Sequence, residues 1–332
     1  MCNGFCNILA TFEDEELVKT ASFCFSRTLG EQFSFNLASK EIIQALLTRF
    51  TSTDSVKVKT YLLWPLYIMC KYAVIDFEDI QPIFIAFVEC FPSYMNVKNT
   101  LEPNFATEAF GATEAHPLYV GALTAVANIV RSYTDSRIIQ FCDEESCVLI
   151  QKLLNDPKII ITEVSVAVFT LISSVLSRGN EAVAQQIYNF KVFEKIDELY
   201  FIADVEAQDM MYWTVSNLLQ AITLTPALVS HLVDDLRYFE LLYDVFSHTQ
   251  FEYSVLSLVE SLLVVGEQLE NETVIFNPFA LKFATCGGVA ILEKLKNQEN
   301  YLAETILETF YDEEYTNFLA RQRGLKTKKA HK

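Results

Sequence analysis

Apolar positions recur every three or four residues along most of the chain, which is the spacing of one face of an α-helix. This periodicity is sustained from residue 39 onward. Residues that form turns are sparse, with 9 Gly and 8 Pro in 332 residues. In the segment that contains Asn217, for example, the pattern predicts helices over 181–188, 193–201 and 207–222. The sequence therefore predicts an all-α fold with short connections.

Several of the apolar segments share one layout, in which a large or small apolar residue is followed four positions later by a small or polar one. The last position of this motif falls at residues 27, 68, 128, 173, 217 and 261, so the successive gaps are 41, 60, 45, 44 and 44 residues. Gaps of 41 to 45 residues are typical of solenoids built from helical pairs or triplets. We expect residues 1–332 to form a single right-handed, armadillo- or HEAT-like superhelical solenoid of about seven repeats.

The 60-residue gap is too long for one repeat and too short for two. It contains residues 91–116, where Pro and Gly interrupt the pattern, and we expect an irregular or degraded repeat there. Residues 1–16 and 320–332 are expected to be flexible ends. The last twelve residues are strongly basic. They fit a solvated end, a basic sorting signal or an intramolecular ligand for the acidic body.

Composition excludes several classes of function. The formal charge of -18 opposes binding to nucleic acid, which needs clustered Lys and Arg, but it suits a basic peptide. The richest apolar stretches, 62–75 and 80–91, are short and carry Lys71 or Glu89, so we expect no membrane span. The first ten residues lack the basic start of a secretory signal. We therefore expect the protein in a reducing compartment.

No pattern of catalytic or metal-binding residues is visible. The eight cysteines are unevenly spaced, without a CxxC pair, and are expected to be free thiols rather than zinc ligands. The four histidines are far apart in sequence, and nucleotide-binding and hydrolase motifs such as GxxxxGK[ST] and GxSxG are absent. We expect no catalytic residues, no metal, no cofactor and no enzymatic activity.

Three segments resemble the importin-alpha (karyopherin-alpha) family. Trp213-Thr-Val-Ser-Asn217 is similar to the family's armadillo signature W-[TA]-[IVL]-S-N, and residues 121–130 resemble P-A-L-R-x-V-G-N-I-V. Residues 276–311, with the paired Gly287 and Gly288, are similar to the family's last repeat. Residues 118–311 follow the family's order of repeats, and 17–91 follow it more loosely. The resemblance implies an armadillo fold and an adaptor that binds basic nuclear-localisation peptides in a concave groove.

Trp213 and Asn217 lie one helical turn apart, so both project from the same face of a helix. The asparagine amide offers a donor and an acceptor to an extended peptide backbone. The tryptophan ring offers a wall for the stem and the cation of Lys or Arg. The resemblance and the repeat spacing place further peptide-binding positions at Asn128, Asp209, Phe169, Ser173 and Trp64.

Some of these positions lack the paired chemistry of the family. Phe169 and Ser173 stand where the family has Trp and Asn, and Trp64 is followed by Pro65, so packing in the core is the alternative interpretation for all three. Only one repeat keeps both Trp and Asn, which indicates a weakened cargo site.

The alternative function is an armadillo-repeat interaction scaffold unrelated to nuclear import. For the adaptor, we expect basic-signal cargo as the main partner and an export receptor at the C-terminal repeats. The chain shows no Arg-rich N-terminal segment of the kind that binds importin-beta in this family, so binding of importin-beta is not expected.

Overall fold

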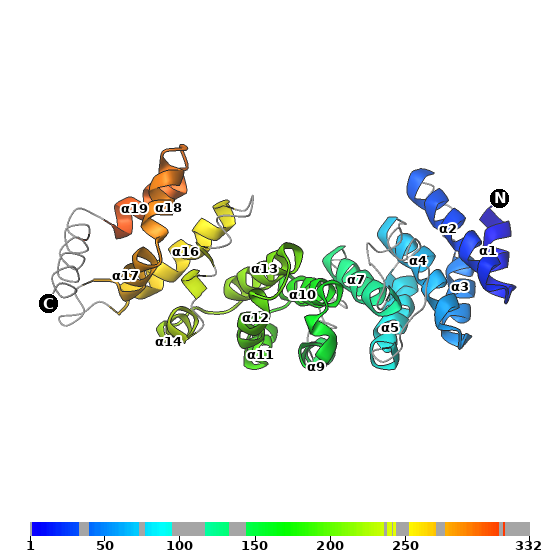
Figure 1. The fold of residues 1–332 in the computed structure, drawn as a ribbon. Helices are drawn as coiled ribbons and strands as arrows, with labels where there is room; N and C mark the ends of the chain where they lie inside the picture. Colours follow the sequence, from blue (N-terminus) through cyan, green and yellow to red (C-terminus); the bar gives the residue numbers. More distant parts are fainter. Residues whose placement is uncertain are drawn as a thin grey trace. The chain divides into compact units, whose positions relative to one another are not determined.

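The computed structural model describes residues 2–32, 40–72, 77–94, 117–132, 144–235, 238–240, 242–243, 252–269, 276–311 and 315. All regular elements within these ranges are helices, as the periodicity predicts (Figure 1). They are α1 (Cys2–Thr11), α2 (Glu15–Gln32), α3 (Lys40–Ser52), α4 (Val56–Tyr72), α5 (Phe77–Tyr94), α7 (Pro117–Ser132), α9 (Glu144–Leu154), the 3-10 helix η2 (Pro157–Ile160), α10 (Thr162–Leu176), α11 (Glu181–Asn189), α12 (Val192–Tyr200), α13 (Val205–Ala221), α14 (Pro226–Ser230), the π-helix η3 (His231–Asp235), α16 (Glu252–Glu267), α17 (Pro278–Thr285), α18 (Gly288–Lys296) and α19 (Tyr301–Phe310).

The helices expected over 181–222 are confirmed as α11, α12 and α13 to within two residues at each end. Local chemistry sets their starts. The Asn180 side chain accepts a hydrogen bond from the Val183 amide at the first turn of α11, and the Asp204 side chain accepts one from the Ala207 amide at the start of α13. Between α11 and α12, Lys191 adopts a left-handed conformation with φ 60° that breaks the helix and redirects the chain.

The chain divides into two compact units by its internal contacts. Unit 1 comprises residues 1–190 and 202–214, and unit 2 comprises residues 191–201 and 215–332. The boundary therefore falls within α13. The prediction of one continuous array over 1–332, and its number of repeats, stays a prediction.

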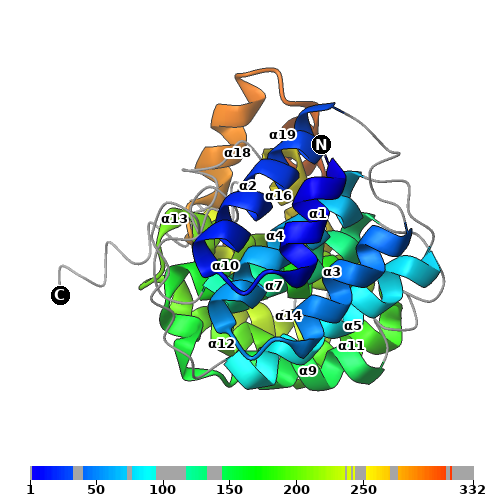
Figure 2. The same cartoon turned by 90° about the vertical axis from the view of Figure 1, so that its right-hand side faces the viewer.

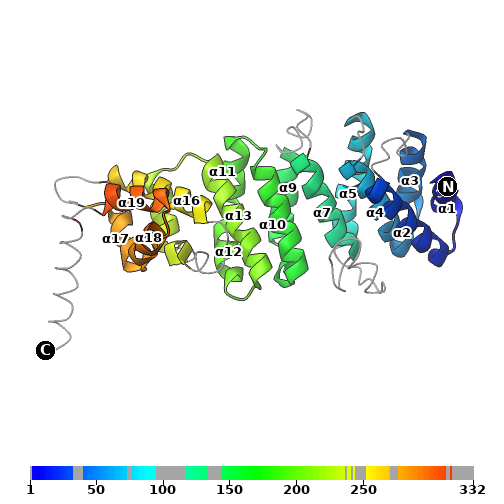
Figure 3. The ribbon, with the colours of Figure 1, turned by 90° about the horizontal axis from the view of Figure 1, so that it is seen from above.

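Unit 1 is built from two layers of helices. One layer contains α1, α3 and α5, in which α3 contacts both neighbours, together with α9 and α11, which contact each other. The other layer contains α2, α4, α7 and α10, each in contact with the next (Figures 1 and 2). These four helices of 15 to 18 residues, together with α13, are called the long helices below. Figure 3 shows α4, α7 and α10 side by side. Each repeat of unit 1 thus contributes a helix to each layer, which is the arrangement expected of a solenoid.

The core of unit 1 lies between these layers. Its largest fully buried side chains include Phe25, Phe50, Phe87, Tyr119 and Phe169. The rings of Phe50 and Phe87, from α3 and α5, meet edge to face with centroids 5.7 Å apart. Neighbouring long helices are also joined by a hydrogen bond, since the buried Ser22 hydroxyl of α2 donates to the carbonyl of Tyr61 in α4.

The N-terminal end carries a packed helix, and the flexibility expected of residues 1–16 stays a prediction. Residues 2–11 form α1, which contacts α2 and α3 and buries Leu9 completely. The packing of this short apolar helix on two neighbours supplies a stability that its own length does not. Residues 320–332 and all but the first four residues of 91–116 lie outside the described residues, so those two expectations are not addressed.

Unit 2 contains α12, the last part of α13, α14, η3, α16, α17, α18 and α19. Helix α16 contacts α14, α17 and α19, and α18 contacts α17 and α19. The Tyr311 hydroxyl donates a 2.9 Å hydrogen bond to the Ala280 carbonyl, and the rings of Phe239 and Phe283 pack at 5.1 Å. None of the described helices of either unit is long and apolar enough to cross a membrane.

Candidate peptide-binding face

Helix α13 carries partly exposed side chains along one side, which we call the α13 stripe. Beyond the first turn it runs through Asp209, Trp213 and Asn217, which are half-buried, to the exposed Gln220. The residues between them, from Met211 to Leu219, are otherwise buried. A spacing of three to four residues keeps these side chains on one face of a helix. The α13 stripe therefore presents a carboxylate, an indole and two amides in succession.

One hydrogen bond joins the unit 1 part of this helix to α10. The Thr214 hydroxyl lies 3.0 Å from the carbonyl of Phe169 in α10 and 2.9 Å from that of Met210, within hydrogen-bonding distance of both. The ring of Tyr212, fully buried, lies 5.8 Å from that of Trp213 at a tilt of 57°. The buried face of α13 thereby holds the Trp213 indole in a defined place at the surface.

Helix α7 has an equivalent α7 stripe formed by the half-buried Thr124 and Asn128 and the exposed Arg131. The amide nitrogen of Asn128 donates to the Thr124 carbonyl at 2.9 Å and to the hydroxyl of Tyr67, on α4, at 3.1 Å. An asparagine amide has two N–H donors, so both are engaged within the protein. What Asn128 offers to a ligand is consequently its amide oxygen, an acceptor for a peptide N–H.

On α10 the structure does not expose the predicted positions. Phe169 is 0% exposed and Ser173 is buried, so neither side chain presents a surface to a peptide, and their assignment as contact residues is wrong for this structure. After its first residue, the half-buried residues of α10 are instead Glu163, Val166 and Thr170. The repeat spacing aligns Phe169 with Trp213, but the open position of α10 is the next residue, Thr170. The open side of α10 is therefore rotated by one residue from the side that the motif predicts. We call these three residues the α10 stripe.

Trp64 lies in the core rather than on an open face. Its side chain is 9% exposed and packs edge to face on Phe23 of α2, with ring centroids 5.6 Å apart. Helix α4 continues through Pro65, and residues 61–67 are all buried. Of the two interpretations of Trp64, the structure favours packing.

The long helices of unit 1 carry opposite charges at their two ends. Carboxylates lie near their N-terminal ends, with Glu163 on α10 and Glu206 and Asp209 on α13. Cations lie near the C-terminal ends, where Arg131 on α7 is exposed and Arg178, just beyond α10, donates to the Arg131 carbonyl at 2.6 Å. This polarity complements the helix dipoles. A basic ligand would therefore be attracted to the N-terminal halves of the stripes and repelled from the C-terminal ends.

No metal site is evident in the described part of the chain, and its buried Cys70 is not a reactive thiol. There, no three His, Cys, Asp or Glu side chains gather closely enough to hold a metal ion. Complete burial raises the pKa of the Cys70 thiol to about 12, which keeps it protonated and weakly nucleophilic.

Two layers of paired helices and a row of open helical faces define an armadillo-type repeat protein, as the all-α solenoid prediction anticipated. The structure is similar to that of a designed armadillo repeat protein, with a TM-score of 0.51 and 15% identity over 80% of this chain and 95% of that one. It is also similar to an engineered protein, with a TM-score of 0.59 and 17% identity over 94% of this chain and 68% of that one. No protein-family model and no curated protein matches the sequence.

Proposed function

We propose that this protein is an adaptor of the importin-alpha type that binds basic peptides along its long helices. The observation that carries the proposal is the α13 stripe, in which Asp209, Trp213 and Asn217 follow one another at intervals of four residues, all half-buried. An indole flanked by a carboxylate and an amide suits a Lys or Arg side chain and the backbone beside it. Asn128 adds an acceptor for a peptide N–H on α7.

The proposed ligand is an extended segment of a cargo protein that carries Lys or Arg, and the net charge of -18 supports its attraction. In line with the resemblance to importin-alpha, we propose that the protein works in the cytoplasm and the nucleus, that it has no enzymatic activity, and that an export receptor binds its C-terminal repeats. Binding of importin-beta is not part of the proposal.

The test is a fluorescence anisotropy titration of a labelled, capped peptide of six alternating Lys and Arg residues. The wild-type chain should bind it, and Trp213→Ala combined with Asn217→Ala should weaken binding by about tenfold or more, because an aromatic wall and a paired amide are both lost. Tyr301→Ala is the matched control, since Tyr301 is an aromatic residue 83% exposed on α19. Deletion of residues 321–332 should be run in parallel, because this basic tail could compete for the same face.

A second function is favoured by specific features of the same helices. Arg27 and Arg131 place cations on α2 and α7, and the buried Phe169 and Ser173 close the aligned position on α10. These features suit a scaffold that binds a less basic partner. If no basic peptide binds, even to the chain without residues 321–332, the scaffold replaces the adaptor as the proposed function.

A further inference from the structure

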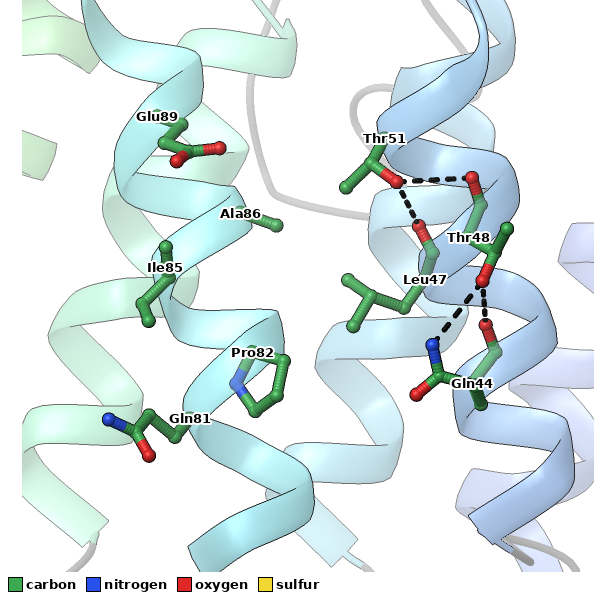
Figure 4. A pocket seen from close by; sticks show the side chains of 9 residues that line it. All are labelled: Gln44, Leu47, Thr48, Thr51, Gln81, Pro82, Ile85, Ala86 and Glu89. Carbon is green, nitrogen blue, oxygen red and sulfur yellow. Dashed lines mark hydrogen bonds between the residues drawn. The ribbon is translucent and has the colours of Figure 1, made fainter.

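A groove lies in the other layer of unit 1, between α3 and α5, and takes no part in the proposed function. It has a volume of about 520 Å³. Its walls include Gln44, Leu47 and Thr51 from α3, and Pro82, Ile85 and Glu89 from α5 (Figure 4). In Figure 4 the two helices run side by side, with Gln44 facing the end that holds Gln81 and Pro82, and Thr51 facing the end that holds Glu89.

The α3 wall offers acceptors and few donors. The Thr48 hydroxyl donates to the Gln44 carbonyl at 2.7 Å, and the Thr51 hydroxyl donates to the Leu47 carbonyl at 3.0 Å, so both hydroxyl hydrogens serve their own helix. The Gln44 amide nitrogen lies 3.4 Å from the Thr48 hydroxyl oxygen, to which it donates. The acceptors that remain along this wall are the lone pairs of the two threonine hydroxyls and the side-chain amide oxygen of Gln44.

The α5 wall adds an apolar surface and a negative charge. Ile85 is 46% exposed in the groove, and the rings and methyl groups of Pro82 and Ala86 extend that surface. Pro82 has no N–H, so it donates nothing to the carbonyl one turn earlier in α5. Glu89 is exposed at the far end, and no Lys, Arg or His is among the lining residues. The groove thus combines an aliphatic wall, one carboxylate and several oxygen acceptors with the amide N–H groups of Gln44 and Gln81.

We propose that this groove is a second peptide site, which takes an extended segment of a partner protein through one Lys or Arg side chain. The aliphatic stem would lie on Ile85 and Pro82, and the cationic head would reach Glu89 and the Thr51 oxygen. Gln81 and Glu89 are separated by about 12 Å along α5, which is the length of three to four extended residues. A side chain with an aliphatic stem and a cationic head is the one that an apolar wall next to a carboxylate recognises.

The probe is a capped tetrapeptide of alternating Leu and Arg that carries a photo-crosslinker, read by anisotropy and by mass spectrometry of the crosslinked peptides. We expect crosslinks to α3 and α5. Glu89→Gln should weaken binding by about two- to fivefold, the range for an exposed ion pair. Ile85→Lys should weaken it at least tenfold, because it adds a like charge to the site and removes the apolar wall. The matched control is Val148→Lys, which changes an exposed aliphatic residue of α9 and should leave binding unchanged.

Three results would overturn this site: equal affinity of the tetrapeptide with Glu in place of Arg, equal affinity of free arginine, or equal losses from Ile85→Lys and Val148→Lys. The Trp213→Ala and Asn217→Ala variant separates the two proposals. It should leave tetrapeptide crosslinks to α3 and α5 intact, whereas Ile85→Lys should leave binding of the six-residue basic peptide to the long helices intact. Each site can therefore fail while the other stands.

Discussion

The chain makes the same turn twice, between α11 and α12 and between α17 and α18, but with different residues. In both, one residue adopts a left-handed conformation, Lys191 with φ 60° and Gly287 with φ 93°. In both, an asparagine caps the preceding helix, Asn180 before α11 and Asn277 before α17. The geometry is shared because a repeat needs two short helices joined by an abrupt change of direction. Glycine adopts that conformation at no steric cost, whereas lysine does so under strain.

The two turns also differ in the sizes of two neighbouring buried side chains. Gly288 begins α18, and a Cβ added to it would lie 2.3 Å from a ring carbon of Phe283. The corresponding position after the first turn holds Val192, fully buried, and the residue that corresponds to Phe283 is Ile187, which is also fully buried. One repeat thus combines a large aromatic ring with a glycine, and the other has two branched aliphatic side chains. The larger ring of Phe283 thus faces the smallest residue at position 288, because in a close-packed core the size of one side chain limits the size of its neighbour.

The largest effect should come from Gly288→Ala. The new methyl group cannot fit beside the Phe283 ring, so the variant should lose about 3 kcal/mol of stability from overpacking. Urea unfolding followed by circular dichroism gives this value, and hydrogen exchange should show the loss in α17 and α18.

Two further variants sharpen this result. Phe283→Leu should recover part of the loss when combined with Gly288→Ala, because it makes room for the methyl group. Gly4→Ala is the control, since nothing lies within 4 Å of a Cβ at Gly4 and alanine favours the helix. A Gly288→Ala chain as stable as the wild type would show that the Phe283 ring does not limit the size of the residue at position 288.

The two asparagine caps should differ in strength. The Asn277 side chain is buried, accepts from the amides of Phe279 and Ala280 at 3.0 and 3.1 Å, and donates to the Leu263 carbonyl at 2.6 Å. Asn180 is exposed and accepts one bond, from the Val183 amide at 3.0 Å. Asn277→Ala should therefore cost about 2 kcal/mol and Asn180→Ala about 1 kcal/mol.

Thermal unfolding of the two alanine variants tests this order. Asn277→Ser serves as a control, because its hydroxyl keeps a cap acceptor but is too short to reach the Leu263 carbonyl, and its stability should fall between those of the wild type and Asn277→Ala. Equal losses at positions 180 and 277 would mean that burial adds nothing to the cap.

These turns also show how much of the structure can be predicted from the sequence. The helices over 181–222 follow from apolar spacing, and the paired Gly287 and Gly288 mark the second turn directly. The first turn carries no such mark, because lysine is not a residue that favours the left-handed region, and only the tertiary fold imposes it. Propensity alone therefore predicts the existence of both helix pairs but the conformation of only one turn.

The candidate site shows a second limit. The spacing between motifs located the α13 stripe through Trp213 and Asn217, but the same alignment placed Phe169 and Ser173 on the open side of α10, where the structure exposes Thr170 instead. A repeat period fixes where a helix lies along the chain. It does not fix the rotation of that helix, and one residue of error turns a side chain by about 100°. In the sequence, only the polar residues Glu163 and Thr170, seven positions apart, indicate this face, because Val166 between them is apolar.

A smaller effect is expected at Lys191, which occupies in the first turn the position that Gly287 occupies in the second. Lys191→Gly removes the strain of a left-handed residue but gives the unfolded chain more freedom, so the net gain should be about 0.5 kcal/mol. Lys191→Ala keeps the strain and is the matched control, with stability close to that of the wild type. If Lys191→Gly is destabilising, contacts of the lysine side chain outweigh its backbone strain. Urea unfolding at constant ionic strength measures the free energy of unfolding of the wild type and the two variants.

The smallest effect concerns the residue just before the second turn, Cys286, whose counterpart before Lys191 is Phe190. Burial and the carboxylate of Glu240 raise the pKa of the Cys286 thiol, and Lys282 partly offsets them. Because a raised pKa disfavours the thiolate, Cys286 should react with iodoacetamide more slowly at pH 8 than in the unfolded chain. Glu240→Gln removes a negative charge, lowers that pKa and should speed alkylation about twofold, whereas Lys282→Gln should slow it by a similar factor. Alkylation followed by mass spectrometry across a pH series measures each rate. An unchanged rate in both variants would leave burial as the cause of the raised pKa, and the charged pair would then have no part in the chemistry of this turn.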